Sequence, residues 1–395
     1  MSLPLEGLRV LDLSQVYAMP GAGMYLADQG ADVIKIEPPT GDLGRVVLTT
    51  APIAGQSRAF WVLNRNKRSL CLDLQQAEGQ AVLHRLVAEA DVIIHTLRTG
   101  VDKKLKADYA TLRAINPRLI YVGFTAWGKR GPFATHRGYD LLVQGMSGMS
   151  GRRLMPDGKP RVTGIWGIDL AASIMVPYAI MLALRQRDQT GEGQEVDCSL
   201  LSAALALQMV DLVRVDEHPE DEDAQDAVAQ ATYGTYLCAD GKFVQIATAA
   251  EAEWRNLCRA LSLEPLLDDQ RFKDNAGRLA NSSALEDMFK QAFARRTAED
   301  WEAVFLEYDV SGAQVLPPDE VFDHVQPNAN DLFVEIQQPG IGNTRMANIP
   351  FKLSAVQGYR YRPAPELGQH SEEILREFGY GAQDIGRLRE NNVIK

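Results

Sequence analysis

The sequence predicts an α/β protein: a large domain with a parallel, Rossmann-like sheet and a smaller α+β domain. Two observations lead to this fold class. Short apolar runs alternate with amphipathic segments over residues 8–124, which is typical of the βαβ units that build parallel sheets. Further along, an acidic stretch precedes a hairpin pattern and three amphipathic segments, which predict the second domain.

The elements of the large domain follow in order from the hydrophobic pattern. Apolar runs predict buried strands at residues 8–13, 33–36, 91–95 and 119–124. The segments between them predict helices at residues 24–29, 75–89 and 112–116. Glycines are frequent over residues 128–167, which predicts long loops, where α/β proteins usually build their sites.

Two helices are predicted after these loops, at residues 168–186 and 199–213. Residues 165–184 contain a single charge and approach the length that spans a bilayer. Asp169 and Pro177 lie inside this segment, and no second segment of the kind follows. We therefore expect a helix that is buried on all sides within a large domain.

The second half of the chain has a different pattern. Residues 233–248 predict a hairpin with Asp240 and Gly241 at its turn. Amphipathic helices are predicted at residues 254–261, 283–294 and 298–308. The C-terminal region is rich in proline and closes with a helix predicted at residues 372–378.

Composition excludes several classes of protein. The chain has 395 residues, with 41 Lys and Arg against 52 Asp and Glu, and a net charge of −11. This sign argues against a protein whose main role is to bind nucleic acid or an anionic membrane. Seven of the acids lie in residues 216–226, which predict a solvated linker. The four cysteines are scattered and the first residues have no export pattern, so we expect a cytoplasmic protein with reduced thiols.

Two patterns point to an anionic ligand. Gly21 and Gly23 lie between two predicted strands, with Glu37 after the second, and this arrangement partly resembles a dinucleotide fingerprint. Leu26 stands where the third glycine belongs, so NAD binding is a weak alternative. Basic residues also recur at the ends of predicted strands and would suit phosphates: Arg45, Arg65, Lys67, Arg68, Arg98, Lys103, Lys104 and Arg137.

Asp169 is the main candidate for catalysis. It follows two glycines and opens the long apolar helix, where the helix dipole favours an ionised carboxylate. The residues alone leave two roles open, a helix cap and a catalytic carboxylate. The six histidines have no spacing that suits a metal, and His136 is the one beside a suspected site.

Six ordered motifs resemble the class III CoA-transferases, the family of formyl-CoA transferase and of the carnitine and bile-acid CoA-transferases. They cover most of residues 5–201: LEGLRVLDLSQVYAMPGAGMYLADQGADVIKIEPPTGDLGR, NRNKRSLCLDL, ADVIIHTLRTGV, NPRLIYVGFTAWGKRGP, RGYDLLVQGMSG and TGEGQEVDCSLL. The ending ELGQHSEEILREFGY also resembles the family's C-terminus.

The resemblance implies that Asp169 is a nucleophile, which would move CoA from an acyl-CoA donor to a carboxylic acid through a mixed anhydride and an aspartyl-CoA thioester. It replaces NAD with CoA as the ligand and implies no metal and no permanently bound cofactor. The CoA-binding residues carried over by motif position are Val16, Tyr17, Leu72, Asp73, Leu74, Gln75, Thr96, Leu97, Arg98, Lys104 and Arg137, and Tyr139 would bind the substrate.

The resemblance also implies a domain plan. Residues 1–215 would form the Rossmann-like CoA-binding domain, completed from the other chain end by residues 330–395. Residues 216–232 would be the acidic linker, and residues 233–325 the small α+β domain. Members of this family form interlocked homodimers, so we expect one here, without nucleic-acid or membrane partners.

Two other functions remain as alternatives. An α-methylacyl-CoA racemase of the same fold carries a histidine in a Gly-His-Asp loop, where this chain reads Gly138, Tyr139 and Asp140. The tyrosine favours transfer, while His136, three residues earlier, keeps racemisation as the runner-up. A CoA-binding protein without catalysis is the third hypothesis, and the presence of Asp169 argues against it.

Overall fold

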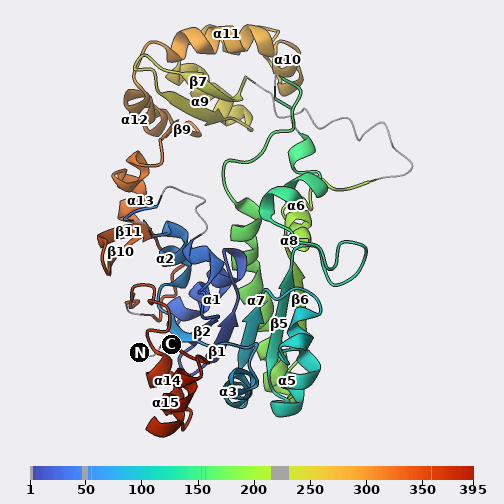
Figure 1. Cartoon of the computed structure of the whole chain (residues 1–395). Helices are drawn as coiled ribbons and strands as arrows, with labels where there is room; N and C mark the ends of the chain where they lie inside the picture. Colours follow the sequence, from blue (N-terminus) through green and yellow to red (C-terminus); the bar gives the residue numbers. More distant parts are fainter. Residues whose placement is uncertain are drawn as a thin grey trace. The chain divides into compact units, whose positions relative to one another are not determined.

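The computed structural model describes residues 3–46, 52–54, 56–152, 154–155, 157–214, 231–356 and 358–395. The acidic run at residues 216–226 lies outside the described residues, as does the predicted linker up to residue 230. The chain divides into two compact units (Figure 1), one made of Met1–Val213 with Asp331–Lys395 and the other of Arg214–Asn330.

A six-stranded sheet forms the centre of the first unit. Its strands are β1 (Arg9–Leu13), β2 (Asp32–Glu37), β3 (Arg68–Cys71), β4 (Val92–His95), β5 (Ile120–Thr125) and β6 (Glu195–Ser199). All neighbouring pairs are parallel, and the order is β3-β2-β1-β4-β5-β6. This is the strand order of Rossmann folds, so the predicted parallel sheet is confirmed. Strands β3 and β6, which form the two edges, were not predicted.

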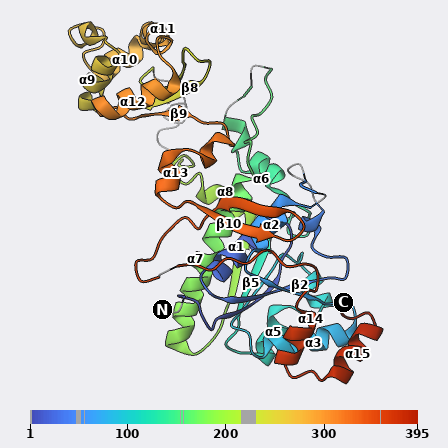
Figure 2. The ribbon, with the colours of Figure 1, turned by 90° about the vertical axis from the view of Figure 1, so that its left-hand side faces the viewer.

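Helices cover both faces of this sheet. Successive residues of each strand point to opposite sides, so each strand contributes side chains to the core on both faces. In β1, Val10 packs with α1 (Ala18–Asp28) and α7 (Gly167–Thr190), while Leu11 packs with α3 (Ala77–Val87). The second layer also contains α5 (Tyr109–Ile115), α14 (Ser371–Glu377) and α15 (Ala382–Glu390). Figure 2 shows the two C-terminal helices beside α3, so the last residues of the chain complete the layer begun by the first half.

The remaining elements of this unit are short. They are α2 (Arg58–Asn64), α4 (Val101–Lys104), α6 (Asp140–Met146), α8 (Leu200–Ala206) and an antiparallel pair, β10 (Phe333–Gln338) with β11 (Gly342–Ala347). Two predictions about this region are wrong. The glycine-rich residues 128–167 contain the helix α6 and not loops alone, and α8 ends at Ala206, before the predicted end at residue 213.

The prediction that the long apolar helix is buried on all sides is also wrong. In α7, Ile168, Ala172, Val176 and Ile180 lie four residues apart and are buried against the sheet layer. A second stripe with the same spacing is exposed: Leu170, Ile174, Tyr178 and Leu182, with exposed fractions of 41% to 68%. By length and composition, α7 is the one helix among the described residues that could cross a membrane.

The glycines of the supposed dinucleotide loop lie inside α1, which begins at Ala18. A Cβ atom on Gly21 would lie 2.6 Å from Cβ of Ser173 in α7, and one on Gly23 would lie 2.9 Å from Oδ2 of Asp12. These glycines therefore allow α1 to pack closely against its neighbours, and the NAD interpretation loses the loop on which it depended.

The second unit is an α+β structure. Strands β7 (Tyr233–Leu237) and β8 (Phe243–Ala247) form the predicted hairpin, with Gly241 in the left-handed region at φ +79° in its turn. A third strand, β9 (Gly312–Val315), pairs with β8 and was not predicted. The helices are α9 (Glu251–Ala260), α10 (Asn275–Ala280), α11 (Ser282–Phe293), α12 (Ala298–Tyr308) and α13 (Val325–Ala329). Several aromatic side chains pack together in the core between sheet and helices, among them Trp254, Phe289, Phe293 and Trp301.

Candidate active site

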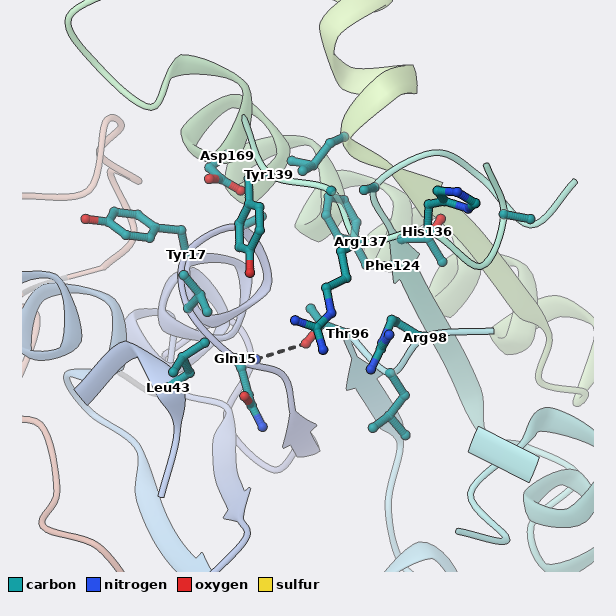
Figure 3. Close-up of a pocket in the computed structure, with 18 residues that line it drawn as sticks. Gln15, Tyr17, Leu43, Thr96, Arg98, Phe124, His136, Arg137, Tyr139 and Asp169 are labelled. Carbon is teal, nitrogen blue, oxygen red and sulfur yellow. Dashed lines mark hydrogen bonds between the residues drawn. The ribbon is translucent and has the colours of Figure 1, made fainter. Parts of the chain in front are cut away.

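A cavity of about 420 Å³ lies at the carboxyl ends of β1 and β4. Between these two neighbouring strands the strand order reverses, since β2 and β3 lie on one side of them and β5 and β6 on the other. Ligands of open α/β sheets bind at such a switch point, because the chains that leave the two strands diverge there. The cavity wall includes residues 15–18 after β1 and residues 96–98 after β4 (Figure 3).

Asp169 lies in this cavity wall, as the third residue of α7. The cap of this helix comes from Asp140 at the start of α6: its Oδ2 atom accepts hydrogen bonds from the backbone N–H groups of Ile168 (2.8 Å) and Asp169 (3.0 Å). Gln144 donates from Nε2 to the other oxygen of Asp140 and accepts from the backbone N–H of Thr163. The cap role considered for Asp169 is therefore wrong, because another carboxylate fills it.

This arrangement changes the acidity of Asp169. Burial raises its pKa, since a charged carboxylate loses water contacts there, and the nearby Asp140 raises it further, to about 7. A carboxylate of such a high pKa is a stronger base and nucleophile than an exposed aspartate, and perturbed values of this kind are typical of functional sites.

Two guanidinium groups lie in the same cavity wall. Arg98 follows β4, and Arg137 lies in the loop before α6. Neither side chain has an acidic partner among the residues that the structure describes. Figure 3 shows Arg137 and Arg98 on the side of the cavity away from Asp169. The cavity thus has a cationic end that suits phosphates and a carboxyl end that suits a reacting group.

The structure brings most of the predicted site residues together and separates others from them. The cavity is lined by Val16, Tyr17, Thr96, Leu97, Arg98, Arg137, Tyr139 and Asp169. Five residues predicted to bind CoA are not in its wall: Leu72, Asp73, Leu74, Gln75 and Lys104.

Each of these five residues has another environment. Leu72 is buried in the core at 1% exposure, and Leu74 packs against the same core cluster. Asp73 accepts a hydrogen bond from the backbone of Gln75, which is itself exposed, and the exposed Lys104 ends α4.

Sequence reasoning missed several lining residues, among them Gln15, Leu43, Phe124 and Leu200. Gln15 precedes a predicted site residue directly, so the motif could have included it. Leu43 and Leu200 are distant in sequence and carry no polar group, and no local signal marks them. His136 lines the cavity but is drawn on the opposite side from Asp169 in Figure 3 and packs against Phe133 at 5.3 Å between ring centroids. In the described part of the chain, no group of three or more His, Cys, Asp or Glu side chains could hold a metal.

A protein-family model described as CoA-transferase family III matches residues 5–371. The chain belongs to this family. It is 33% identical to a succinate–glutarate CoA-transferase of Agrobacterium fabrum, over 95% of this chain and 96% of the relative. It is 30% identical to a succinyl-CoA–D-citramalate CoA-transferase of Chloroflexus aurantiacus, over 99% and 98% of the two chains.

A solved structure, a CaiB/BaiF family protein of Brucella suis, is 30% identical to this chain, with a TM-score of 0.82 over 96% of this chain and 100% of the other. The family model and the two relatives agree. This protein is therefore an enzyme of the CoA-transferase class, and CoA thioesters are its substrates.

Proposed function

We propose that this CoA-transferase moves CoA from an acyl-CoA donor to a carboxylic acid, with Asp169 as the nucleophile. The observation that supports this most directly is the polarity of the cavity. A carboxyl group of raised pKa lies at one end. At the other end lie the guanidinium groups of Arg98 and Arg137, which have no acidic partner among the described residues. An acyl-CoA has the same polarity, with a thioester at one end and phosphates at the other.

The proposed reaction has four steps. The Asp169 carboxylate attacks the thioester carbonyl of the donor, the carbon–sulfur bond breaks, and a mixed anhydride and CoA thiolate form. The thiolate then attacks the aspartyl carbonyl, which releases the donor acid and leaves an aspartyl-CoA thioester. The acceptor carboxylate attacks this thioester and expels the thiolate again. The thiolate finally attacks the acceptor's carbonyl, which gives the new acyl-CoA and frees Asp169.

We propose that CoA is bound jointly by the residues after β1, the residues after β4 and the loop before α6. Arg98 and Arg137 hold phosphates through charge-assisted hydrogen bonds, and Thr96 and Leu97 line the path next to them. Val16, Tyr17 and Tyr139 line the remaining wall and would surround the pantetheine arm and the acyl group. Leu72, Asp73, Leu74, Gln75 and Lys104 lie outside this cavity, so we leave them out of the proposed binding site.

The relatives suggest which substrates to test first. Their names include succinate, glutarate and citramalate, which are all dicarboxylic acids. We propose succinyl-CoA as a donor and a dicarboxylic acid of four or five carbons as an acceptor.

The cavity also bears on the alternative racemase. Exchange of an α-proton between two faces of one carbon needs an acid and a base that reach the same atom. Asp169 and His136 lie on opposite sides of the cavity, with Arg137 and Tyr139 drawn between them in Figure 3, which favours transfer.

An interlocked homodimer is part of the proposal. The exposed stripe Leu170, Ile174, Tyr178 and Leu182 begins directly after Asp169, and a soluble protein rarely leaves so many large apolar side chains in one row uncovered. A second copy that covers this stripe would also exclude water from the anhydride.

We also propose a cytoplasmic location.

Measurement of the intact mass tests the mechanism. The protein is mixed with a panel of acyl-CoAs, succinyl-CoA first, with and without hydroxylamine. We expect a CoA-sized adduct that hydroxylamine removes and that Asp169→Ala never forms. Asp188→Ala is the matched control, because Asp188 is an exposed carboxylate near the other end of α7. If acyl-CoAs bind without an adduct and α-protons exchange with deuterated water, the racemase is correct instead.

A further inference from the structure

The turn between β1 and α1 contains an unusual backbone conformation. Val16 has φ +77°, in the left-handed region that glycine favours and that a β-branched residue almost never adopts. Val16 lines the cavity together with Gln15 and Tyr17 on either side of it. A conformation of this kind persists only where the surroundings hold it, and such residues cluster at functional sites.

Asp42 is the side chain that holds Val16. Its Oδ1 atom accepts a hydrogen bond from the backbone N–H of Val16 at 3.1 Å and another from the backbone N–H of Gly44 at 2.6 Å. Its Oδ2 atom forms an ion pair with Nζ of Lys35 at 2.7 Å, and the exposed fractions of the two side chains are 1% and 0%. Its own N–H donates to Glu37 at 3.0 Å. The carboxylate is therefore fixed from three directions inside the protein.

The residues before Val16 are fixed as well. Nζ of Lys35 also donates to the carbonyl oxygen of Ser14 at 3.0 Å, and the N–H of Gln15 donates to Oγ1 of Thr96 at 3.0 Å. On the other side, Gly44 approaches closely: a Cβ atom there would lie 3.3 Å from the carbonyl oxygen of Val16. Three consecutive residues of the turn, Ser14, Gln15 and Val16, therefore each have a hydrogen-bond partner. Lys35 and Asp42, which form an ion pair with each other, are two of these three partners.

We propose that Asp42 is a positioning residue for CoA binding, which holds Val16 in its left-handed conformation so that residues 15–17 present a fixed wall to the ligand. Lys35 orients the Asp42 carboxylate and neutralises its charge inside the protein. This inference rests on the proposed function, because it assumes that CoA fills the cavity. Asp42 is not in the cavity wall, so its effect on binding has to pass through Val16.

The test compares Asp42→Asn in three backgrounds. Glycine adopts the left-handed conformation without strain, so Val16→Gly makes the restraint by Asp42 less necessary. Val16→Ala is the matched control, since it also removes the valine methyl groups but keeps the steric penalty of a Cβ atom. Calorimetric titration with free CoA gives the dissociation constant, and the Asp169 adduct is followed by mass.

We expect Asp42→Asn to weaken CoA binding at least tenfold in the wild-type and Val16→Ala backgrounds, and less than threefold in the Val16→Gly background. The adduct on Asp169 should still form at saturating acyl-CoA. An equal loss in all three backgrounds would mean that Asp42 acts on the structure in general, and this would overturn the inference. Normal CoA binding by Asp42→Asn would overturn it too, without affecting the proposed function.

Two further outcomes keep the test decisive. If wild-type protein does not bind CoA, the proposed function fails and this inference fails with it. If Asp42→Asn does not fold, the single variants at Val16 still decide the matter: we expect Val16→Gly to melt at a higher temperature than Val16→Ala. The opposite order, which is usual where the backbone is unstrained, would show that no restraint is needed there.

Discussion

Asp140→Asn offers a direct test of how the fold sets the reactivity of Asp169. The substitution keeps the size of the side chain and an oxygen that can accept from the start of α7, but it removes the negative charge beside Asp169. The pKa of Asp169 is raised from 3.8 to about 7, with burial as the larger cause and Asp140 as the second.

The magnitude follows from this order of causes. Asp140 accounts for less than half of a rise of about three pKa units, so its removal should lower the pKa of Asp169 by roughly one unit, or about 1.4 kcal/mol. Because the proposed mechanism needs an ionised Asp169, the rate of adduct formation should fall as the pH drops through this pKa. We therefore expect the acid limb of the rate profile to move from near pH 7 to near pH 6.

The assay follows the formation of the CoA adduct with one acyl-CoA between pH 5 and pH 9. Gln144→Met is the matched control: it removes a hydrogen bond to the same carboxylate of Asp140 but leaves both charges in place. Its acid limb should stay where the wild-type limb lies. If Asp140→Asn folds and its limb does not move, or moves to higher pH, the contribution assigned to the charge of Asp140 is refuted.

Three further predictions concern stability and binding. Asp169→Asn should raise the free energy of unfolding by roughly 4 kcal/mol at pH 8 and by less than about 1 kcal/mol at pH 4, because folding raises the pKa of this carboxyl from 3.8 to about 7 and so disfavours its ionised form. An equal gain at both pH values in thermal unfolding would contradict this. Gly21→Ala should lower the free energy of unfolding by about 1–3 kcal/mol, since the new Cβ atom would lie 2.6 Å from Cβ of Ser173. Gly145→Ala in α6, where the space is open, should raise it by up to about 1 kcal/mol, and chemical denaturation measures both changes. Arg137→Met should raise the KM for acyl-CoA by about 10-fold to 100-fold at nearly constant kcat, because a charge-assisted hydrogen bond contributes roughly 1.5–3 kcal/mol. An unchanged KM in steady-state kinetics would be evidence against a phosphate contact.

Local patterns in the sequence were enough for the elements with a clear periodicity. The strands around residues 8–13, 33–36, 91–95 and 119–124 were predicted because each is a short apolar run, and the hairpin because an Asp-Gly turn separates two extended segments. The edge strands β3 and β6 were missed. Their sequences, RSLC and EVDCS, mix polar and apolar residues, and the neighbouring strand determines their conformation.

The helix α7 illustrates the limit of such patterns. Its sequence is apolar all round, so nothing in the periodicity tells the buried stripe from the exposed one. The layer of α1 and the sheet selects one face, and the other face stays open among the described residues. The dinucleotide interpretation of the glycines of α1 is wrong for a related reason. Their role depends on close neighbours from other segments, Ser173 for Gly21 and Asp12 for Gly23.

Short segments of the sequence are enough to predict the fold class and the family, because strand periodicity and ordered motifs are local properties, and the same motifs mark Asp169 as the candidate nucleophile. Only the folded chain shows that Asp140 and not Asp169 caps α7, that Arg98 and Arg137 line one cavity, and that Asp42 accepts a hydrogen bond from the backbone of Val16. These contacts join segments that are far apart in the chain. Burial and charge at such junctions set the pKa values and backbone conformations, and both depend on the packed arrangement.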